Sequence, residues 1–307
     1  MRIFRSFEEA GGLKNPVVTT GSFDGVHIGH KSILNRLRML ADKYNGESVL
    51  ITFHPHPRKV LYPETAGRDL RLINSQEEKI YLLEKAGLDN VIIIKFTLEF
   101  SKVTSEQFVR DYLSNALKSR VVVVGFNHHF GFNKEGDYRQ LWGWREKYNF
   151  EAEEIPEQEV EHETVSSTRI RKAISEGYIQ RANAYLDYYY LVMGIAGQPE
   201  QSPSNPGDRF YRIPVTDENK LLPSDGIYAV TVESRKNTYK GLVLINTLNR
   251  SEPQVFVQLI GYNDDISDHS VRLLFRKKIT GPVLLSDPAL TRTRMNFAID
   301  EISELIY

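Results

Sequence analysis

The sequence predicts an α/β protein in which a doubly wound parallel sheet of the Rossmann-like type is followed by a small antiparallel β-barrel. In the first 186 residues, β-prone runs alternate with stretches of helical periodicity, which implies a mostly parallel sheet covered on both faces. After a stretch rich in Pro, Ser, Asn and Gly at 198–208, strand-like runs follow one another without helices between them. We therefore expect two domains, at 1–186 and 187–307.

Local patterns predict the elements of the first domain in order. Strands are expected where β-branched and apolar residues cluster, at 17–20, 48–53, 91–96 and 121–124. Helices are expected where apolar residues recur at helical spacing, at 33–40, 76–86, 105–117 and 137–148. Two of these helices begin with the residue types of a capping box, Ser75 with Glu78 and Thr104 with Gln107.

The second domain is predicted from four consecutive strand-like runs. The texture of the sequence changes near Leu186, which is where we place the boundary. The runs lie at 226–233, 240–246, 254–262 and 270–279, and a final helix is expected at 292–305. This pattern indicates a small antiparallel barrel or sandwich closed by a helix.

The composition excludes several classes of partner and site. Lys and Arg (39) nearly balance Asp and Glu (40), so the overall field does not favour nucleic acid or an anionic membrane. The absence of cysteine excludes disulfides and thiolate metal sites and fits a reducing compartment. No apolar run approaches the roughly 18 residues that span a bilayer, and the charged N-terminus is unlike a signal peptide. We expect a cytoplasmic protein without nucleic-acid or membrane partners.

Six of the eight histidines fall in three pairs, each just beyond the carboxyl end of a predicted strand. The pairs are His27 with His30, His54 with His56, and His128 with His129. In an open α/β sheet the ligand crevice lies outside these strand ends. We therefore expect three loops, far apart in the sequence, to meet there.

The first pair belongs to a glycine-rich segment, Gly21–His30, which we call the glycine loop. Its three glycines let the backbone approach a ligand closely, and it runs into a helix whose free amides can meet phosphate oxygens. His27 and His30 are three positions apart and lie on the same side of that first turn. Two imidazoles placed there can donate hydrogen bonds to a phosphate that acquires charge, which suits in-line phosphoryl or nucleotidyl transfer.

A second anion-binding signal is the segment 165–171, in which three hydroxyl residues precede a helix expected to end near Gly177. Hydroxyls, free helix amides and a guanidinium form a good site for a leaving pyrophosphate. Its two arginines, Arg169 and Arg171, lie in the first turn, where they oppose the helix dipole and so indicate an anionic partner.

Two further loops carry the other histidine pairs. The segment 53–58 is expected to be extended, because its prolines stiffen it against a helix. The segment 125–131 offers aromatic and amide groups that can hold a planar ring and a base edge.

Each signal also has a simpler interpretation. The glycine loop could be a plain turn or carry a zinc pair, although no cysteine and no suitably spaced carboxylate support zinc. The hydroxyls at 166–168 could serve only as a helix cap. The loops at 53–58 and 125–131 could be a rigid connector and a packing element.

Taken together, these segments resemble the bacterial bifunctional riboflavin kinase/FAD synthetase family. The N-terminal FMN adenylyltransferase module of that family carries Gly-x-Phe-Asp-Gly-x-His-x-Gly-His, Pro-His-Pro, Gly-x-Asp-Phe-x-Phe-Gly and Ser-Ser-Thr-x-Ile-Arg in this order. All four motifs are recognisable across roughly residues 15 to 186, and the ordered set is more specific than any one of them. The resemblance implies a nucleotidyltransferase in which the FMN phosphate attacks the α-phosphorus of ATP, with Mg²⁺, to give FAD and pyrophosphate.

The resemblance also implies a role for each matching residue. His27, His30 and Arg169 would be catalytic. The nucleotide would be held by Gly21, Phe23, Asp24, Gly25, Gly29, Ser166, Ser167, Thr168 and Arg171. The flavin would contact His56, Pro57, Asn127, His128 and Phe130. No metal ligand from the protein is implied, ATP and FMN are the expected partners, and the sequence does not indicate an oligomeric state.

The N-terminal motifs depart from the family pattern at two positions. Ser22 stands where the family usually has Asn, and Asn127 stands where it usually has Asp. Both changes keep a hydrogen-bonding side chain, but the second removes a charge, so it affects the expected flavin and metal contacts more than the adenylyl-transfer core.

The C-terminal half is similar to the family's riboflavin kinase barrel in its framework, notably at 222–230, but departs from it in its chemistry. Pro214–Asp217 replaces the family's Pro-Thr-Ala-Asn, and Phe256 stands at the position of the catalytic Glu. Phenylalanine cannot accept the hydroxyl proton of riboflavin. We therefore expect the kinase to be impaired or lost, unless Glu252 or Asp217 serves instead.

Our leading hypothesis is an FMN adenylyltransferase with a degenerate kinase-like domain. One alternative is a fully bifunctional riboflavin kinase/FAD synthetase, and another is a flavin- or nucleotide-binding regulator without catalysis. Nucleotidyltransferases for pantetheine phosphate or nicotinate mononucleotide share His-x-Gly-His but lack the appended barrel.

Overall fold

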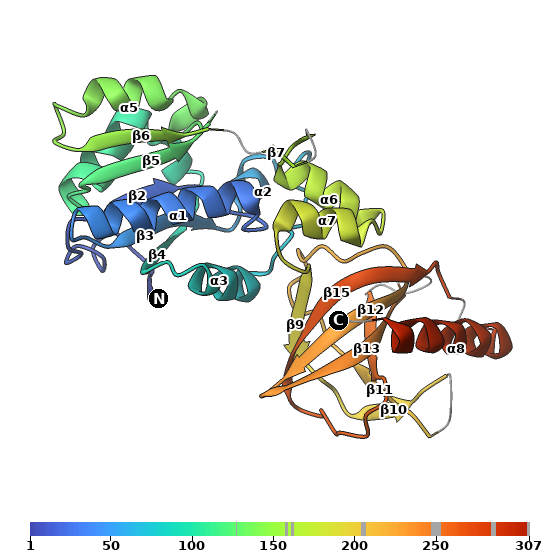
Figure 1. Ribbon diagram of the computed structural model, residues 1–307. Coiled ribbons are helices and arrows are strands. Elements are labelled where there is room, and N and C mark those ends of the chain that lie inside the picture. The colour runs from blue at the N-terminus through green and yellow to red at the C-terminus, as the bar shows by residue number, and fades with distance from the viewer. Residues whose placement is uncertain are drawn as a thin grey trace. The chain divides into compact units, whose positions relative to one another are not determined.

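The computed structural model describes residues 1–126, 128–156, 159–160, 163–203, 207–246, 253–283 and 287–305 (Figure 1). Contacts divide the chain into two compact units. The first comprises Met1–Leu70 and Lys79–Ser166, and the second comprises Arg71–Glu78 and Ser167–Tyr307. The second unit therefore includes helices α6 (Ser167–Ser175) and α7 (Ile179–Leu186), although both precede residue 187. The functional domain boundary at 186 stays a prediction.

The first unit is built on a six-stranded parallel sheet in the order β1–β4–β3–β2–β5–β6. The strands are β1 Arg2–Phe4, β2 Val17–Thr20, β3 Ser48–His54, β4 Asn90–Lys95, β5 Val121–Gly125 and β6 Glu151–Ile155. The direction of strand addition reverses between β2 and β5, which is the topological switch point of a doubly wound sheet. The α/β, doubly wound prediction is confirmed.

Burial explains why the central strands form. The four valines of β5 are buried, as are all residues of β2, and such continuous β-branched runs are typical of strands covered on both faces. Helix α1 (Ile28–Lys43) packs on β2, β3 and β5 through its buried stripe, in which Leu34 and Leu37 are fully buried. The remaining α-helices assigned wholly or partly to this unit are α2 Pro57–Leu61, α3 Gln76–Lys85, α4 Ser105–Gln107 and α5 Tyr138–Trp144.

Both predicted capping boxes are confirmed. The backbone N–H of Ser75 donates to Glu78 (2.9 Å) and that of Glu78 donates to the Ser75 hydroxyl (3.2 Å). Thr104 and Gln107 cap each other in the same way at the start of α4. The helix that follows differs from a plain α-helix, because Phe108–Ala116 (η2) winds as a π-helix.

The prediction of a fully extended segment at 53–58 is wrong at its end. A short helix, α2, begins at Pro57, with the His56 side chain accepting a hydrogen bond from the backbone N–H of Arg58 (3.1 Å). Proline is tolerated at the first helical position because its missing N–H would have no intrahelical partner there. The prolines therefore fix where the helix starts and do not exclude it.

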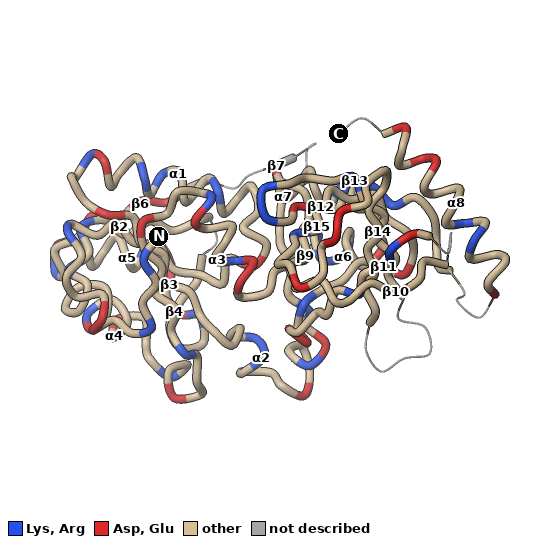
Figure 2. The backbone as a smooth tube through the Cα atoms, turned by 90° about the horizontal axis from the view of Figure 1, so that it is seen from below, with Lys and Arg blue, Asp and Glu red and all other residues tan. Residues whose placement is uncertain are grey.

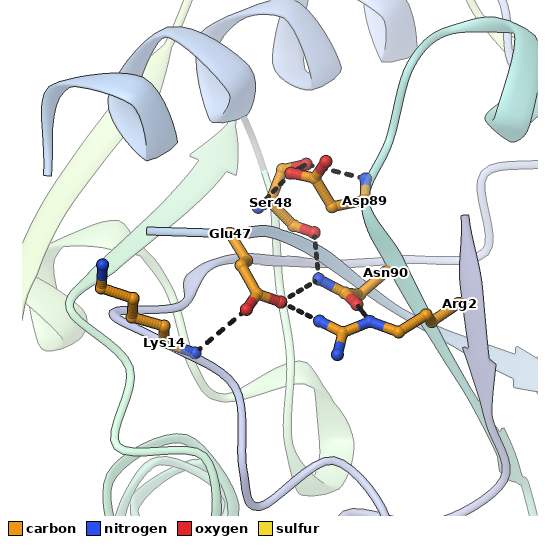
Figure 3. A network of polar contacts seen from close by, with 6 residues as sticks. All are labelled: Arg2, Lys14, Glu47, Ser48, Asp89 and Asn90. Atoms are coloured by element: carbon orange, nitrogen blue, oxygen red, sulfur yellow. Dashed lines mark hydrogen bonds and ion pairs between the residues drawn. The ribbon is translucent and has the colours of Figure 1, made fainter. Parts of the chain in front are cut away.

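A polar network ties the amino ends of the strands together (Figure 3). Asn90 is fully buried at the start of β4, where it accepts from Arg2 (2.9 Å) and donates to Glu47 (3.0 Å). Beside it, the Asp89 carboxylate accepts from the backbone N–H and the hydroxyl of Ser48 (2.9 and 2.7 Å). The predicted histidine loops follow the carboxyl ends of the strands, so this network lies at the opposite edge of the sheet from them.

The second unit contains one seven-stranded antiparallel sheet in the order β10–β11–β14–β13–β12–β15–β9. The strands are β9 Leu191–Ile195, β10 Pro199–Gln201, β11 Arg209–Arg212, β12 Gly226–Ser234, β13 Asn237–Asn246, β14 Gln254–Leu259 and β15 Ser270–Thr280. The sheet curls on itself, since the backbone N–H of Gly197, just beyond β9, donates to the carbonyl of Arg212 in β11 (2.8 Å). Helix α8 (Pro288–Glu304) packs on β12, β13 and β15, as the predicted final helix should. The barrel-like prediction is confirmed as a curled sheet.

A buried ion pair fastens the segment 71–78 within the second unit. The side chains of Lys220 and Glu78 are each 1% exposed and lie 2.6 Å apart. The Lys220 ammonium also donates to the carbonyls of Ile73 (2.7 Å) and Leu191 (2.9 Å). All three of its protons therefore have acceptors, which is the condition under which a buried charge is tolerated.

Lys and Arg are interspersed with Asp and Glu along the tube of each unit (Figure 2), in agreement with a formal net charge of −1. Within the described part of the chain, no helix is long and apolar enough to cross a membrane.

Candidate functional site

The carboxyl ends of β2, β3 and β5 carry the three loops that hold the histidine pairs. The glycine loop follows Thr20 of β2, the second loop begins at His54 of β3, and the third follows Gly125 of β5. Because these strands are parallel neighbours, the loops emerge at one edge of the sheet, on both sides of the switch point.

All three loops contribute to one pocket of about 560 Å³ within the first unit, which we call the aromatic pocket. The three loops and the end of β2 contribute Thr20, Gly21, Ser22, His56, Arg58, His128 and His129 to its polar lining, which also includes Ser101, Asn133 and Lys134. Its apolar wall includes Phe53, Pro57, Leu61, Tyr62, Phe96, Phe100, Val103, Phe108, Phe130 and Phe132. A concave site with an apolar lining and a few convergent polar groups is the usual form of a site for a small organic ligand.

The glycine loop has a strained backbone. Phe23 (φ 48°) and Val26 (φ 37°) adopt positive φ angles, which bulky and β-branched residues rarely do, next to Gly25 (φ 91°). Such outliers persist only when the surrounding structure fixes them, and they cluster at functional sites. Space at Gly29 is tight, because a Cβ there would lie 3.3 Å from the ring of His27, which would have to shift slightly.

The two histidines of the loop stack on each other. The ring centroids of His27 and His30 are 3.7 Å apart with an interplanar angle of 18°, and Phe23 stacks on the other side of His30 at 4.4 Å. Burial, with the nearby charges of His27 and Lys79, holds the pKa of His30 well below 6.5. His30 is therefore a neutral imidazole at pH 7, able to donate one hydrogen bond and accept another.

In the third loop, His128 lines the aromatic pocket. Burial and the neighbouring His129 lower the pKa of His128 to about 4, so its ring is neutral at pH 7. Its Nε2 atom is buried and has no hydrogen-bond partner among the described residues. A buried polar nitrogen without a partner costs about 1–3 kcal/mol, so a ligand atom that pairs with it gains affinity. Asn127, predicted to contact flavin, lies outside the described residues.

The segment predicted to hold the leaving pyrophosphate forms the start of α6. Thr168 and Arg169 are exposed, and Arg171 is half-buried. The boundary between the two units falls between Ser166 and Ser167, so α6 is described as part of the second unit. The expected approach of Ser166–Arg171 to the glycine loop stays a prediction.

In the second unit, the position expected for the kinase base is apolar. Phe256 of β14 is 7% exposed and stacks on Phe210 at 4.8 Å, within the core cluster under α8. Asp217 is used locally, because its carboxylate accepts from the backbone N–H of Asn219 (2.9 Å). Glu252, the other alternative base, lies outside the described residues.

Sequence reasoning missed two parts of this site. It did not predict that Phe96, Phe100 and Phe108 would form a wall of the pocket with the predicted Phe130. It also missed Lys79, whose ammonium lies under the glycine loop and donates to the carbonyl of Ser22 (3.3 Å). The aromatic spacing of Phe96 and Phe100 was a usable signal, whereas a lysine on a helix gives none.

Comparison with known proteins gives consistent matches. The sequence profile of the FAD synthetase family matches residues 11–169. The bifunctional riboflavin kinase/FMN adenylyltransferase of Listeria monocytogenes is 31% identical over 75% of this chain and 72% of its own. The protein of the same name from Haemophilus influenzae is 27% identical over 92% of each chain. A crystal structure described as a macrolide-efflux protein from Streptococcus pneumoniae matches over 99% of both chains, with a TM-score of 0.87 and 24% identity, which shows a common fold alone.

Proposed function

The chain belongs to the FAD synthetase family and is an enzyme, and we propose that it transfers the adenylyl group of ATP to FMN. An oxygen of the FMN phosphate attacks the α-phosphorus, the bond from that phosphorus to the bridging oxygen breaks, and pyrophosphate leaves. The products are FAD and pyrophosphate. The observation that carries this proposal is the junction of a strained, histidine-bearing glycine loop with an aromatic pocket at one switch point.

The aromatic pocket suits the planar, three-ringed part of a flavin. Phe53, Phe96 and Phe100 form edge-to-face and tilted pairs along one wall, and a flat apolar ring system gains both burial and stacking energy there. His128 would pair with a polar atom of the ring edge. Pro57 and His56 would close the opposite side, as the family motif implies.

The glycine loop would serve the phosphates. Amides at the start of α1 favour negative charge, and the neutral His30 can donate a hydrogen bond to an oxygen of the α-phosphate as charge develops there. His27, stacked on it, would hold the ring in place and donate a second hydrogen bond. Ser166–Thr168, with Arg169 and Arg171, would receive the leaving pyrophosphate.

Mg²⁺ would enter with ATP. The described residues contain no group of three or more His, Asp or Glu placed to hold a metal, and Mg²⁺ is commonly bound through substrate phosphates with one or two carboxylates and several waters. When bound, it would neutralise charge on the triphosphate.

We further propose that riboflavin phosphorylation is impaired or lost. Phe256, packed on Phe210 in the core, cannot act as the base that the family's glutamate supplies. The relatives, by their names, retain both activities, so a bifunctional enzyme is the second candidate. A cytoplasmic location and the absence of nucleic-acid partners stay predictions.

One experiment separates these candidates. The purified chain is incubated with ATP and Mg²⁺, and with either FMN or riboflavin, and the flavins are resolved by chromatography. We expect FAD from FMN and no FMN or FAD from riboflavin. FMN formed from riboflavin would favour the bifunctional enzyme, and tight flavin binding without FAD synthesis would favour a regulator.

A further inference from the structure

A buried lysine supports the glycine loop from behind. Lys79, in the first turn of α3, is 8% exposed. Its ammonium donates to the carbonyl of Ser22 (3.3 Å) and to the hydroxyl of Thr52 (3.3 Å), and that hydroxyl itself donates to the Ser22 carbonyl (3.3 Å). The three groups form a triangle between α3, β3 and the glycine loop.

This arrangement is costly for the folded protein. A lysine on a helix normally places its ammonium in water, and a buried charge is expensive unless it is well compensated. Burial lowers the pKa of Lys79 to about 8, against the opposing influence of Asp24. Among the described residues, its hydrogen bonds go only to Ser22 of the glycine loop and to Thr52 of β3. Titratable groups that are strongly perturbed in this way concentrate at functional sites.

The contacts of Lys79 lead directly to the reacting histidines. The carbonyl of Ser22 belongs to the peptide that enters the strained turn, and Phe23, the next residue, has a positive φ and stacks on His30 (4.4 Å). Fixing that carbonyl therefore fixes the ring on which His30 rests.

We propose that Lys79 is a positioning residue for adenylyl transfer, which clamps the Ser22 carbonyl and thereby holds His30 in its reactive place. The proposal rests on the proposed function of the glycine loop. The ammonium acts through Ser22 and Phe23 and need not touch the substrates. It also disfavours a second positive charge on His30, so that the loop keeps a neutral imidazole.

The test compares Lys79→Met, which keeps an unbranched side chain one atom shorter and removes the charge, with Lys85→Met at an exposed position of the same helix. We expect Lys79→Met to lower kcat for FAD formation about 100-fold, the size of effect that a misplacement of about 1 Å produces. The KM values for ATP and FMN should stay within about threefold, because the clamp is not a substrate contact. Lys85→Met should resemble the unaltered protein.

Two further readouts separate positioning from loss of structure. In the unaltered protein kcat should fall as the pH rises through about 8, since Lys79 then loses its proton, and this limb should vanish in Lys79→Met. Asp24 raises the pKa of Lys79, and Lys79 in turn lowers the pKa of His30. Because burial holds the pKa of His30 well below 6.5, His30 does not produce a limb near pH 8. The pKa of His30, followed by NMR, should rise in Lys79→Met.

The outcomes distinguish this inference from the proposed function. If the unaltered protein makes no FAD, the proposed function is wrong, and the NMR comparison alone then decides whether Lys79 controls His30. If FAD is made and Lys79→Met turns over normally, or if its loss follows the unfolded fraction alone, the clamp is wrong. Should Lys79→Met not fold, Lys79→Gln, which retains a donor without charge, is measured in the same way.

Discussion

The ion pair between Lys220 and Glu78 allows a quantitative prediction of stability. Replacing Lys220 by Met removes the ammonium and its three hydrogen bonds of 2.6–2.9 Å, and leaves the Glu78 carboxylate buried without a cation. Breaking a buried pair by removing one partner costs about 3–5 kcal/mol. Glu78 keeps hydrogen bonds from the backbone N–H groups of Ser75 (2.9 Å) and Met193 (3.0 Å). We therefore expect the lower end of that range, about 3 kcal/mol.

The assay is urea unfolding with two signals. Both tryptophans, Trp142 and Trp144, lie in the first unit, so fluorescence reports that unit, whereas circular dichroism reports both. The midpoint seen by circular dichroism should move to lower urea more than the midpoint seen by fluorescence. Lys236→Met, at an exposed lysine between β12 and β13, is the matched control.

A double variant tests the assigned cause. Lys220→Met combined with Glu78→Gln removes the stranded charge, so it should recover part of the loss, and the two changes should not be additive. A loss below about 1 kcal/mol for Lys220→Met, the level typical of exposed pairs, would refute the reasoning.

Three further predictions follow from the first unit. Asn90→Ala should lower the free energy of unfolding by about 1–3 kcal/mol, because Glu47 and the Ser48 carbonyl lose a buried donor. The value of kcat/KM should not change, because this network lies at the edge of the sheet opposite the site. A changed kcat/KM would contradict the assigned location of the site. Acid should destabilise the protein: His128 has a folded pKa of about 4 against 6.5 when exposed, so the unfolded state binds the proton first and stability is lost as pH falls from about 6.5 toward 4. The loss should be shallower in His128→Gln, and equal slopes in the two proteins would contradict the assignment. His128→Ala should raise the KM for FMN about tenfold, the equivalent of one hydrogen bond, and leave the KM for ATP unchanged in initial-rate assays; equal effects on both substrates would argue against a flavin contact.

Features of the fold that depend on residues close together in the sequence were predictable from the sequence. The capping boxes at Ser75 and Thr104 are local hydrogen-bond patterns, and the buried valines of β5 need only a covered parallel sheet. The edge strands β1 and β6 were not predicted, because a short run such as Arg2–Phe4 and an acidic run such as Glu151–Ile155 lack a strand signal of their own. Their pairing depends on partners distant in the sequence.

The site divides in the same way. Glycine and histidine spacing indicated the loops, and the order of the strands then places them together at one edge of the sheet. Lys79 and Lys220 could not be recognised, because burial of a lysine is decided by tertiary contacts and not by the residue type. Adjacent residues of α3 illustrate this: Glu78 pairs with Lys220, while Lys79 supports the glycine loop. Neither use leaves a periodic trace in the sequence.

The central claim is that His30 and its loop promote attack on the α-phosphorus of ATP. The most direct measurement is a single-turnover reaction of ATP labelled at the α-phosphorus with FMN, in the unaltered protein and in His30→Ala. We predict that the label enters FAD, and that His30→Ala slows its transfer by at least about 100-fold, as for loss of a group acting in the transition state, with little change in thermal stability. Label that fails to enter FAD, or a fully active His30→Ala, would contradict the account.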